Sequence, residues 1–138
     1  MAHHRTELRN AAWNALRVAA RMRDMIFIKA WAQGIDEETL PAWTVATPRE
    51  QSGAAAKDTL RRDVMLSVVV KRAGGDDIED QLDLDSAAIE AAVLPVILPL
   101  CLHAEIDQTD LKMQGQGERR VGVVEVRFAC TIMTDTAG

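Results

Sequence analysis

The chain has 138 residues, of which 48% are hydrophobic and 27% are charged, and it contains no tyrosine. This length suits a single domain, residues 1–138, whose core is built mainly from aliphatic side chains. The net charge of −5 argues against a protein that binds free nucleic acid, and the longest apolar run, residues 91–102, is too short for a membrane span.

Charge is distributed unevenly along the sequence. Residues 1–29 carry six basic and two acidic side chains, a balance of +4, whereas the remainder carries ten basic and nineteen acidic ones, a balance of −9. Two oppositely charged surfaces on one small domain suit head-to-tail contact between copies, and two separately solvated faces are the alternative. No apolar segment follows the polar start of the chain, so we expect no signal peptide.

Helical periodicity predicts a first helix over residues 7–23, with one apolar stripe. Trp13 and Arg17 lie off this stripe, and Trp13 is therefore expected at a protein contact. Short buried strands are expected over residues 25–31 and 43–47, the second of them closed by a proline.

Trp31 and Trp43 lie at the ends of these short strands, and we expect both in the core. Residues 49–58 contain a glycine and three consecutive alanines and offer little to a core. We interpret this segment as an exposed loop or a mobile hairpin arm, which we expect to become ordered against a partner.

The clearest strand is predicted over residues 60–72, where apolar side chains alternate with more polar ones. A second helix is predicted over residues 76–94, with carboxylates in its first turns, at the positive end of the helix dipole, and with Pro95 and Pro99 ending it. Asp85 conflicts with its apolar stripe, so either the helix kinks there or Asp85 faces a partner. The stripe itself consists of Ile78, Leu82, Ile89, Val93 and Val96.

Two final strands, over residues 103–114 and 120–134, are expected to form a hairpin around a turn at residues 115–117. The complete order is helix, two short strands, long strand, helix and hairpin. It predicts an α+β fold in which a single, mostly antiparallel β-sheet has two α-helices packed on one face.

Residue types that carry chemistry form no convincing constellation. Glu105, Asp107 and Asp110 could be metal ligands, but a solvated strand face explains them better. Cys101 and Cys130 lack metal-binding spacing and are expected to be buried free thiols in a reducing compartment. We therefore expect a protein that is not an enzyme, with no catalytic residues, no metal and no cofactor.

Several segments resemble the tail-terminator family of long-tailed phages, the type of the lambda-like minor tail protein U. The resemblance covers nearly the whole chain in its layout, although each segment alone is common. The matching segments are Leu40-Pro41-Ala42 with Val45, Thr47 and Pro48, then Leu60-Arg61-Arg62, the acidic stretch Asp76–Asp85, and Gly115-Gln116-Gly117-Glu118-Arg119 with Val121-Gly122.

The resemblance implies a homo-oligomer, a hexameric ring that caps the tail tube, stops its polymerisation and contacts a head-side connector or stopper protein. Such a ring assembles in the host cytoplasm and ends at the head-proximal end of the virion tail. DNA passes through its lumen without specific binding, and no membrane is involved. A related head–tail connector or tail-completion (neck) protein is the alternative, followed by a small cytosolic enzyme or ligand-binding domain and by a monomeric adaptor.

Contacts with a neighbouring subunit or partner are expected on the off-stripe side of the first helix, on the segment 49–58 and at the start of the long strand. Paired arginines there suit salt bridges to acids of the next subunit. The residues expected at such contacts are Trp13, Arg17, Arg49, Gln51, Lys57, Arg61, Asp63 and Asp85.

Overall fold

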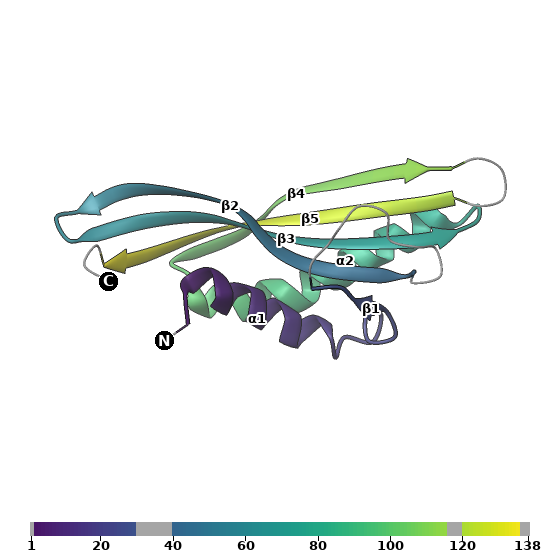
Figure 1. Ribbon diagram of the computed structural model, residues 1–138, viewed down its shortest axis with the longest axis horizontal. Coiled ribbons are helices and arrows are strands. Elements are labelled where there is room, and N and C mark those ends of the chain that lie inside the picture. The colour runs from purple at the N-terminus through teal and green to yellow at the C-terminus, as the bar shows by residue number, and fades with distance from the viewer. Residues whose placement is uncertain (1, 30–39, 116–119, 136–138) are drawn as a thin grey trace.

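The computed structural model describes residues 2–29, 40–115 and 120–135. One five-stranded sheet in the order β1-β2-β3-β5-β4 is covered on one face by two helices, which confirms the predicted α+β fold (Figure 1). A short 3-10 helix, Leu98–Leu100, precedes the last hairpin. The helices are α1 (His4–Leu16) and α2 (Ile78–Ile97), and the strands are β1 (Ile26–Phe27), β2 (Ala42–Ala56), β3 (Thr59–Gly74), β4 (His103–Gln114) and β5 (Arg120–Asp135).

Strand β3 is the centre of the sheet and pairs with β5 in one uninterrupted antiparallel register, from Thr59 opposite Asp135 to Gly74 opposite Arg120. The pairs β2–β3 and β4–β5 are also antiparallel, and only the two-residue β1 runs parallel to its neighbour β2. The hairpin β4–β5 confirms the predicted closing pair of strands. Gly115, directly after β4, has φ 106°, a conformation that favours glycine, and the rest of the predicted turn 115–117 lies outside the described residues.

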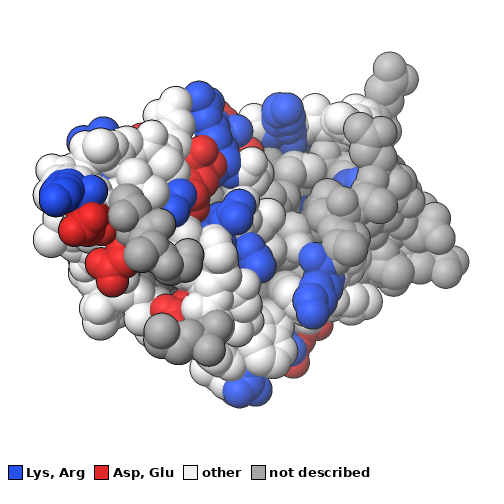
Figure 2. Space-filling model, turned by 60° about the vertical axis from the view of Figure 1, so that its left-hand side comes forward, with Lys and Arg blue, Asp and Glu red and all other residues white. Residues whose placement is uncertain are grey.

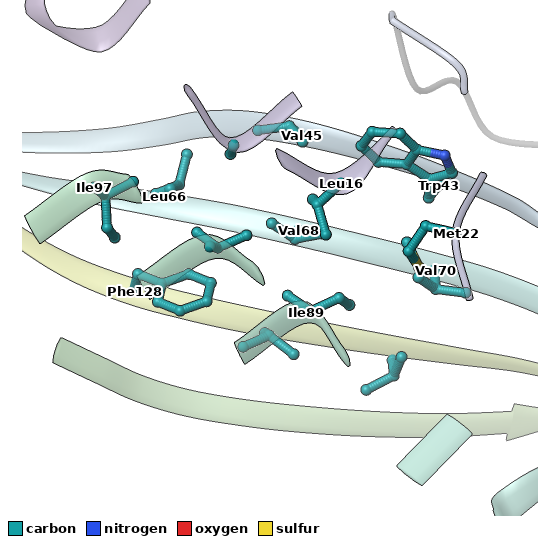
Figure 3. Packing of buried hydrophobic residues seen from close by; sticks show 14 of the residues in the cluster. Leu16, Met22, Trp43, Val45, Leu66, Val68, Val70, Ile89, Ile97 and Phe128 are labelled. Atoms are coloured by element: carbon teal, nitrogen blue, oxygen red, sulfur yellow. The ribbon is translucent and has the colours of Figure 1, made fainter. Parts of the chain in front are cut away.

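The core lies between the sheet and the helices (Figure 3). Alternate residues of β3 and β5 point toward the helices and lie directly opposite each other, for example Leu66 with Phe128 and Val68 with Val126. Since side chains alternate between the two faces of a strand, this confirms the apolar faces predicted for both strands. Trp43 is buried, as predicted, whereas Trp31 lies outside the described residues.

The first helix is shorter than predicted and ends at Leu16, not at residue 23. The chain then winds through turns up to Met25, and only Ile26–Phe27 of the predicted strand 25–31 forms β1 among its described residues. These turns bury Met22 completely and bring Arg21 to α2. Tertiary contacts thus override a helical periodicity that continues past the end of α1.

The sequence predicted that this strand ends before Pro48. In the structure, strand β2 continues to Ala56. The register shifts between Ala46 and Arg49, so the proline lies in a β-bulge, where its missing N–H breaks no ladder hydrogen bond. Of the two interpretations of residues 49–58, the exposed loop is therefore wrong and the hairpin is confirmed. We call residues 49–63 the arm; it extends past the N-terminal end of α1 (Figure 1).

The second helix is also longer than predicted, since it passes through Pro95 and ends at Ile97. Proline leaves the carbonyl of Ala91 without its helical donor, and because both residues are exposed, water can replace that donor. Ile97 and not Val96 completes the buried stripe, because Ile97 lies one turn after the buried Val93.

Candidate subunit interface

Asp85 is wrongly predicted as a contact residue, because it is fully buried within the chain. Arg21, in the turns after α1, donates from Nε to Asp85 Oδ1 at 2.6 Å. Arg72, on β3, donates from Nε to Oδ2 and from Nη2 to Oδ1, each at 2.9 Å. Two arginines of the same molecule therefore balance the carboxylate on the apolar stripe, and it is not available to a neighbour.

Arg21 also ties the chain to the backbone of α2. Its Nη2 donates to the carbonyl oxygen of Gln81 at 3.0 Å and to the side-chain Oε1 of Gln81 at 2.6 Å. The cluster thereby joins three elements: the turns after α1, strand β3 and helix α2. These bonds hold the helices on the sheet.

Trp13 and Arg17 lie together beside a groove of about 500 Å³ between α1 and β2. Trp13 remains 37% exposed, the guanidinium of Arg17 lies 4.8 Å from its ring centroid, and the ring of Phe27 lies 6.1 Å away. Arg9 and Lys29 also line this groove. An exposed aromatic ring beside basic side chains suits a protein contact, and the role predicted for Trp13 stays a prediction.

The face of the sheet away from the helices holds a second groove, of about 520 Å³. Arg49, Gln51 and Asp63 of the arm line one side of it, and the acidic residues Glu105 and Asp107 of β4 line the other. Three of the predicted contact residues therefore meet there, together with two acids that sequence reasoning did not place with them. Polar and apolar residues alternate only loosely along β4, and its register shifts between Ile106 and Gln108. The side of the sheet on which Asp107 lies could therefore not be predicted from the sequence.

The remaining predicted contact residues of the arm lie near its tip. Arg61 Nε is 3.2 Å from Asp63 Oδ2, and Thr131 donates from Oγ1 to Asp63 Oδ1 at 3.0 Å. Lys57 is exposed in the turn between β2 and β3. The predicted residues of the arm thus share one exposed end of the molecule.

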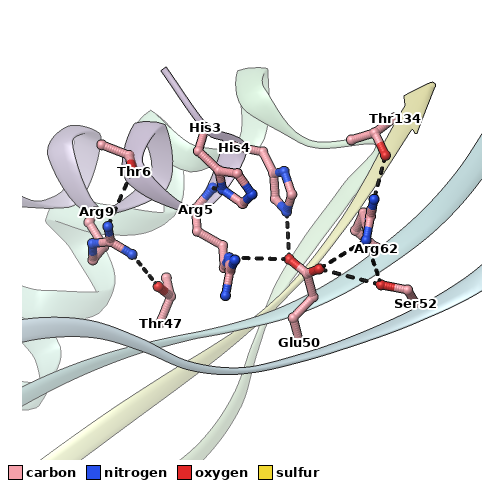
Figure 4. Close-up of polar contacts among 10 residues, drawn as sticks. All are labelled: His3, His4, Arg5, Thr6, Arg9, Thr47, Glu50, Ser52, Arg62 and Thr134. Carbon is pink, nitrogen blue, oxygen red and sulfur yellow. Dashed lines mark hydrogen bonds and ion pairs between the residues drawn. The ribbon is translucent and has the colours of Figure 1, made fainter. Parts of the chain in front are cut away.

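The base of the arm is fastened to α1 by Glu50 (Figure 4). Its Oε1 lies 2.5 Å from His4 Nε2 and 3.6 Å from Arg5 Nε, and its Oε2 lies 3.3 Å from Arg62 Nη1. Burial raises the pKa of Glu50, but the hydrogen bond and charge of His4 and the charges of Arg5 and Arg62 outweigh it, so the net pKa is below its ordinary value.

The cluster around Glu50 also reaches β5. Arg62 donates from Nη1 to Ser52 Oγ at 2.9 Å and from Nε to Thr134 Oγ1 at 3.0 Å (Figure 4). Arg62 therefore joins β3 to both of its neighbours, β2 and β5. Arg62 and Arg72 are the two charged residues on the helix-facing side of β3, and their acidic partners are Glu50 and Asp85.

Charges are divided between the two edges of the sheet. Arg9 on α1, Arg17 directly after it and Lys29 after β1 lie at the β1–β2 edge, which also has Glu50 on β2. Glu105, Asp107 and Asp110 lie on β4, the opposite edge, together with Lys112. On the side that shows the arm end of the molecule, Lys and Arg outnumber Asp and Glu (Figure 2). This arrangement is compatible with contact between the basic edge of one copy and the acidic edge of the next.

A cluster of large apolar side chains is exposed where α2 ends and β4 begins. Val96, Leu98, Leu100 and Leu102 all lie within seven residues, and Leu102 is 71% exposed. Residues 91–102 contain no charge. We call these four residues the apolar end of α2; large contiguous apolar patches often mark contacts with other proteins.

The two cysteines are free thiols, and Cys130 is buried whereas Cys101 is partly exposed. A hydrogen bond between them raises the pKa of the Cys130 thiol, with burial adding to the effect, and lowers the pKa of Cys101 against the effect of its own burial. Within residues 2–29, 40–115 and 120–135, no three His, Cys, Asp or Glu side chains converge as metal ligands. No helix in these ranges is long and apolar enough to cross a membrane.

No protein-family model matches the sequence, and no curated protein matches it.

Proposed function

We propose that this chain is a non-enzymatic structural subunit of a phage tail. Copies of it form a ring that caps the tail tube, stops its polymerisation and joins the tube to a head-side connector. The resemblance of the sequence segments to tail terminators supports the phage assignment. The order of elements, one sheet with two helices on the same face, is compatible with that family's layout.

The observation that carries the proposal is the apolar end of α2. Leu98, Leu100 and Leu102 are all exposed in the single chain, and a partner that covers a large aliphatic side chain completely gains about 1.5–3 kcal/mol for each one. This possible gain supports the apolar end as a surface for assembly.

Capping can be measured directly with tubes of the matching tail tube protein. Tubes polymerised with this chain should be shorter and uniform under the electron microscope, and should carry a ring at one end. Leu102→Glu should abolish both effects because it introduces a charge into the apolar end. Leu84→Glu is the matched control, since Leu84 is an exposed leucine near the other end of α2.

The two variants separate a specific surface from a general loss of solubility or fold. Circular dichroism should show both to be folded, because both positions are exposed. Tubes of unchanged length distribution in the presence of the unmodified chain, with no ring at either end, would contradict the proposed function.

A further inference from the structure

Two long strand edges have no neighbour among the described strands. Strand β4 is the last of the sheet, and its outer side is unpaired over His103–Gln114. On the other side, β1 covers β2 only at Ala42 and Trp43, so the outer side of the arm, residues 49–56, is unpaired as well. Natural sheets seldom leave long edges open, because each edge offers a row of unpaired N–H and C=O groups to other chains.

The regular parts of these two edges have similar lengths. After the register shift near Asp107, β4 keeps one register from Gln108 to Gln114, which is seven residues. After the bulge at Pro48, the arm keeps one register from Arg49 to Ala54, which is six residues. Each edge therefore offers a ladder of about the same size.

The strand directions allow these two edges to pair with each other. Because β2–β3, β3–β5 and β5–β4 are all antiparallel, β4 runs antiparallel to β2. A second copy in the same orientation would thus place its β2 antiparallel to β4 of the first copy. The antiparallel order of strands in the sheet then continues from one subunit into the next.

Each edge carries both signs of charge: Arg49 and Glu50 lie in the regular ladder of the arm, and Asp110 and Lys112 lie in that of β4. The arm carries Arg49 and Lys57, and beyond its glycine it presents three small alanines, which let another strand approach closely. Arg49 of one copy can face Asp110 of the next, while Lys57 and Asp107 lie just outside the two ladders. Opposite charges across neighbouring strands stabilise pairing, whereas like charges oppose it.

We propose that the arm of one copy adds as a strand to the outer edge of β4 of the next copy, so that the sheets of neighbouring subunits form one continuous antiparallel sheet around the ring. This inference rests on the proposed function and names the surfaces that build the ring. The two edges differ, so the contact is head-to-tail, and rotation of successive copies closes it into a ring.

The contact also sets the offset between copies. In the subunit, Glu105 of β4 lies level with Arg49 through the intervening pairs, so β4 runs alongside the helix-covered half of the sheet while the arm extends away from it. Pairing of the arm with β4 therefore requires each copy to be shifted along the strand direction relative to its neighbour. Strands inclined in this way are typical of closed sheets.

A charge-swap experiment tests the contact. The arm variant carries Arg49→Glu with Lys57→Glu, and the edge variant carries Asp107→Lys with Asp110→Lys. Each variant alone should need about tenfold more protein to assemble, because like charges now face each other across the contact. An equimolar mixture of the two should assemble close to the concentration of the unmodified chain. The matched control, Arg23→Glu with Asp83→Lys, changes exposed charges away from both edges and should assemble normally.

Hydrogen exchange then tests whether the contact is a strand pairing. Amides of residues 108–114 should exchange more slowly in the assembled chain than in the edge variant at the same concentration. This inference is overturned, and the proposed ring stands, if the unmodified chain assembles but two results are negative. These are charge-swap variants that assemble at the normal concentration, and amides of residues 108–114 that exchange no more slowly in the assembled chain. If the unmodified chain stays monomeric at every concentration, both are overturned.

Discussion

Asp85 and Arg72 form a bidentate pair across the two layers of the molecule, with Nε and Nη2 of the arginine each 2.9 Å from one carboxylate oxygen. The pair joins helix α2 to strand β3, and Arg21 adds a third bond from the turns after α1 at 2.6 Å. Asp85, although it lies on the apolar stripe of α2, thus joins three elements of the same chain.

Replacement of Asp85 by alanine should destabilise the fold strongly. Removal of one partner of a buried ion pair costs about 3–5 kcal/mol, and we expect the lower end because the two arginines are partly exposed. Urea unfolding measures the change, with the exposed Asp83→Ala as control. Equal stability of the two variants would mean that the cluster does not hold the layers together.

Gly122 should not tolerate a side chain. A Cβ at this position would lie 2.6 Å from Leu82 Cδ1 and 3.1 Å from Ile78 Cδ1, both buried side chains of α2. Gly122→Ala should therefore displace the buried side chains of Leu82 and Ile78 from their packing, at a cost of about 1–3 kcal/mol by thermal or urea unfolding. Gly75→Ala, where the added Cβ meets nothing within 4 Å, serves as control.

Glu50 should make the stability of the molecule depend on acid pH. Its folded-state pKa is lowered from the ordinary value of 4.5, so its contribution is complete above that pH and is lost as the pH falls through the folded-state value. Glu50→Gln should be less stable than the unmodified chain at pH 7, and the difference should shrink below about pH 4.5 and vanish in stronger acid. A difference that stays constant from pH 7 to pH 2 would exclude an ionised Glu50 as its cause.

Trp13 should matter more for assembly than for folding. Because its ring is 37% exposed, Trp13→Ala should cost less than the roughly 3–5 kcal/mol typical of a buried tryptophan. The assembled fraction in a sizing experiment should fall while the melting temperature changes little. A large drop in melting temperature would place Trp13 among the residues that hold the fold, and would remove it from the interface.

The layered fold could be predicted because β3 and β5 bury one complete face. Their alternating residues, such as Leu66 and Phe128, carry a period of two that is visible in the sequence alone. Residues 49–56 form a strand without such a pattern, because the arm extends past the helices and has no fully buried residue. The amino-acid composition of residues 49–56 therefore resembles that of a loop, although their backbone pairs regularly with β3.

The candidate interface could be predicted only in part, since its residues come together through the sheet. Arg49 and Glu105 line one groove, yet 55 intervening positions separate them in the sequence. For the same reason Asp85 is misassigned: its arginines at positions 21 and 72 belong to other elements, and nothing local predicts that both approach one carboxylate. A charged residue on an apolar stripe predicts a partner correctly, but it does not say whether that partner belongs to the same chain.

The mass of the purified chain under native conditions tests the central claim most directly. We expect one closed species of defined stoichiometry, six copies of the 15.2 kDa chain by resemblance to tail terminators, which loses subunits as ionic strength rises because the contacts between copies involve exposed charges. A 15.2 kDa monomer at all protein and salt concentrations would contradict the assignment of this chain as a ring subunit.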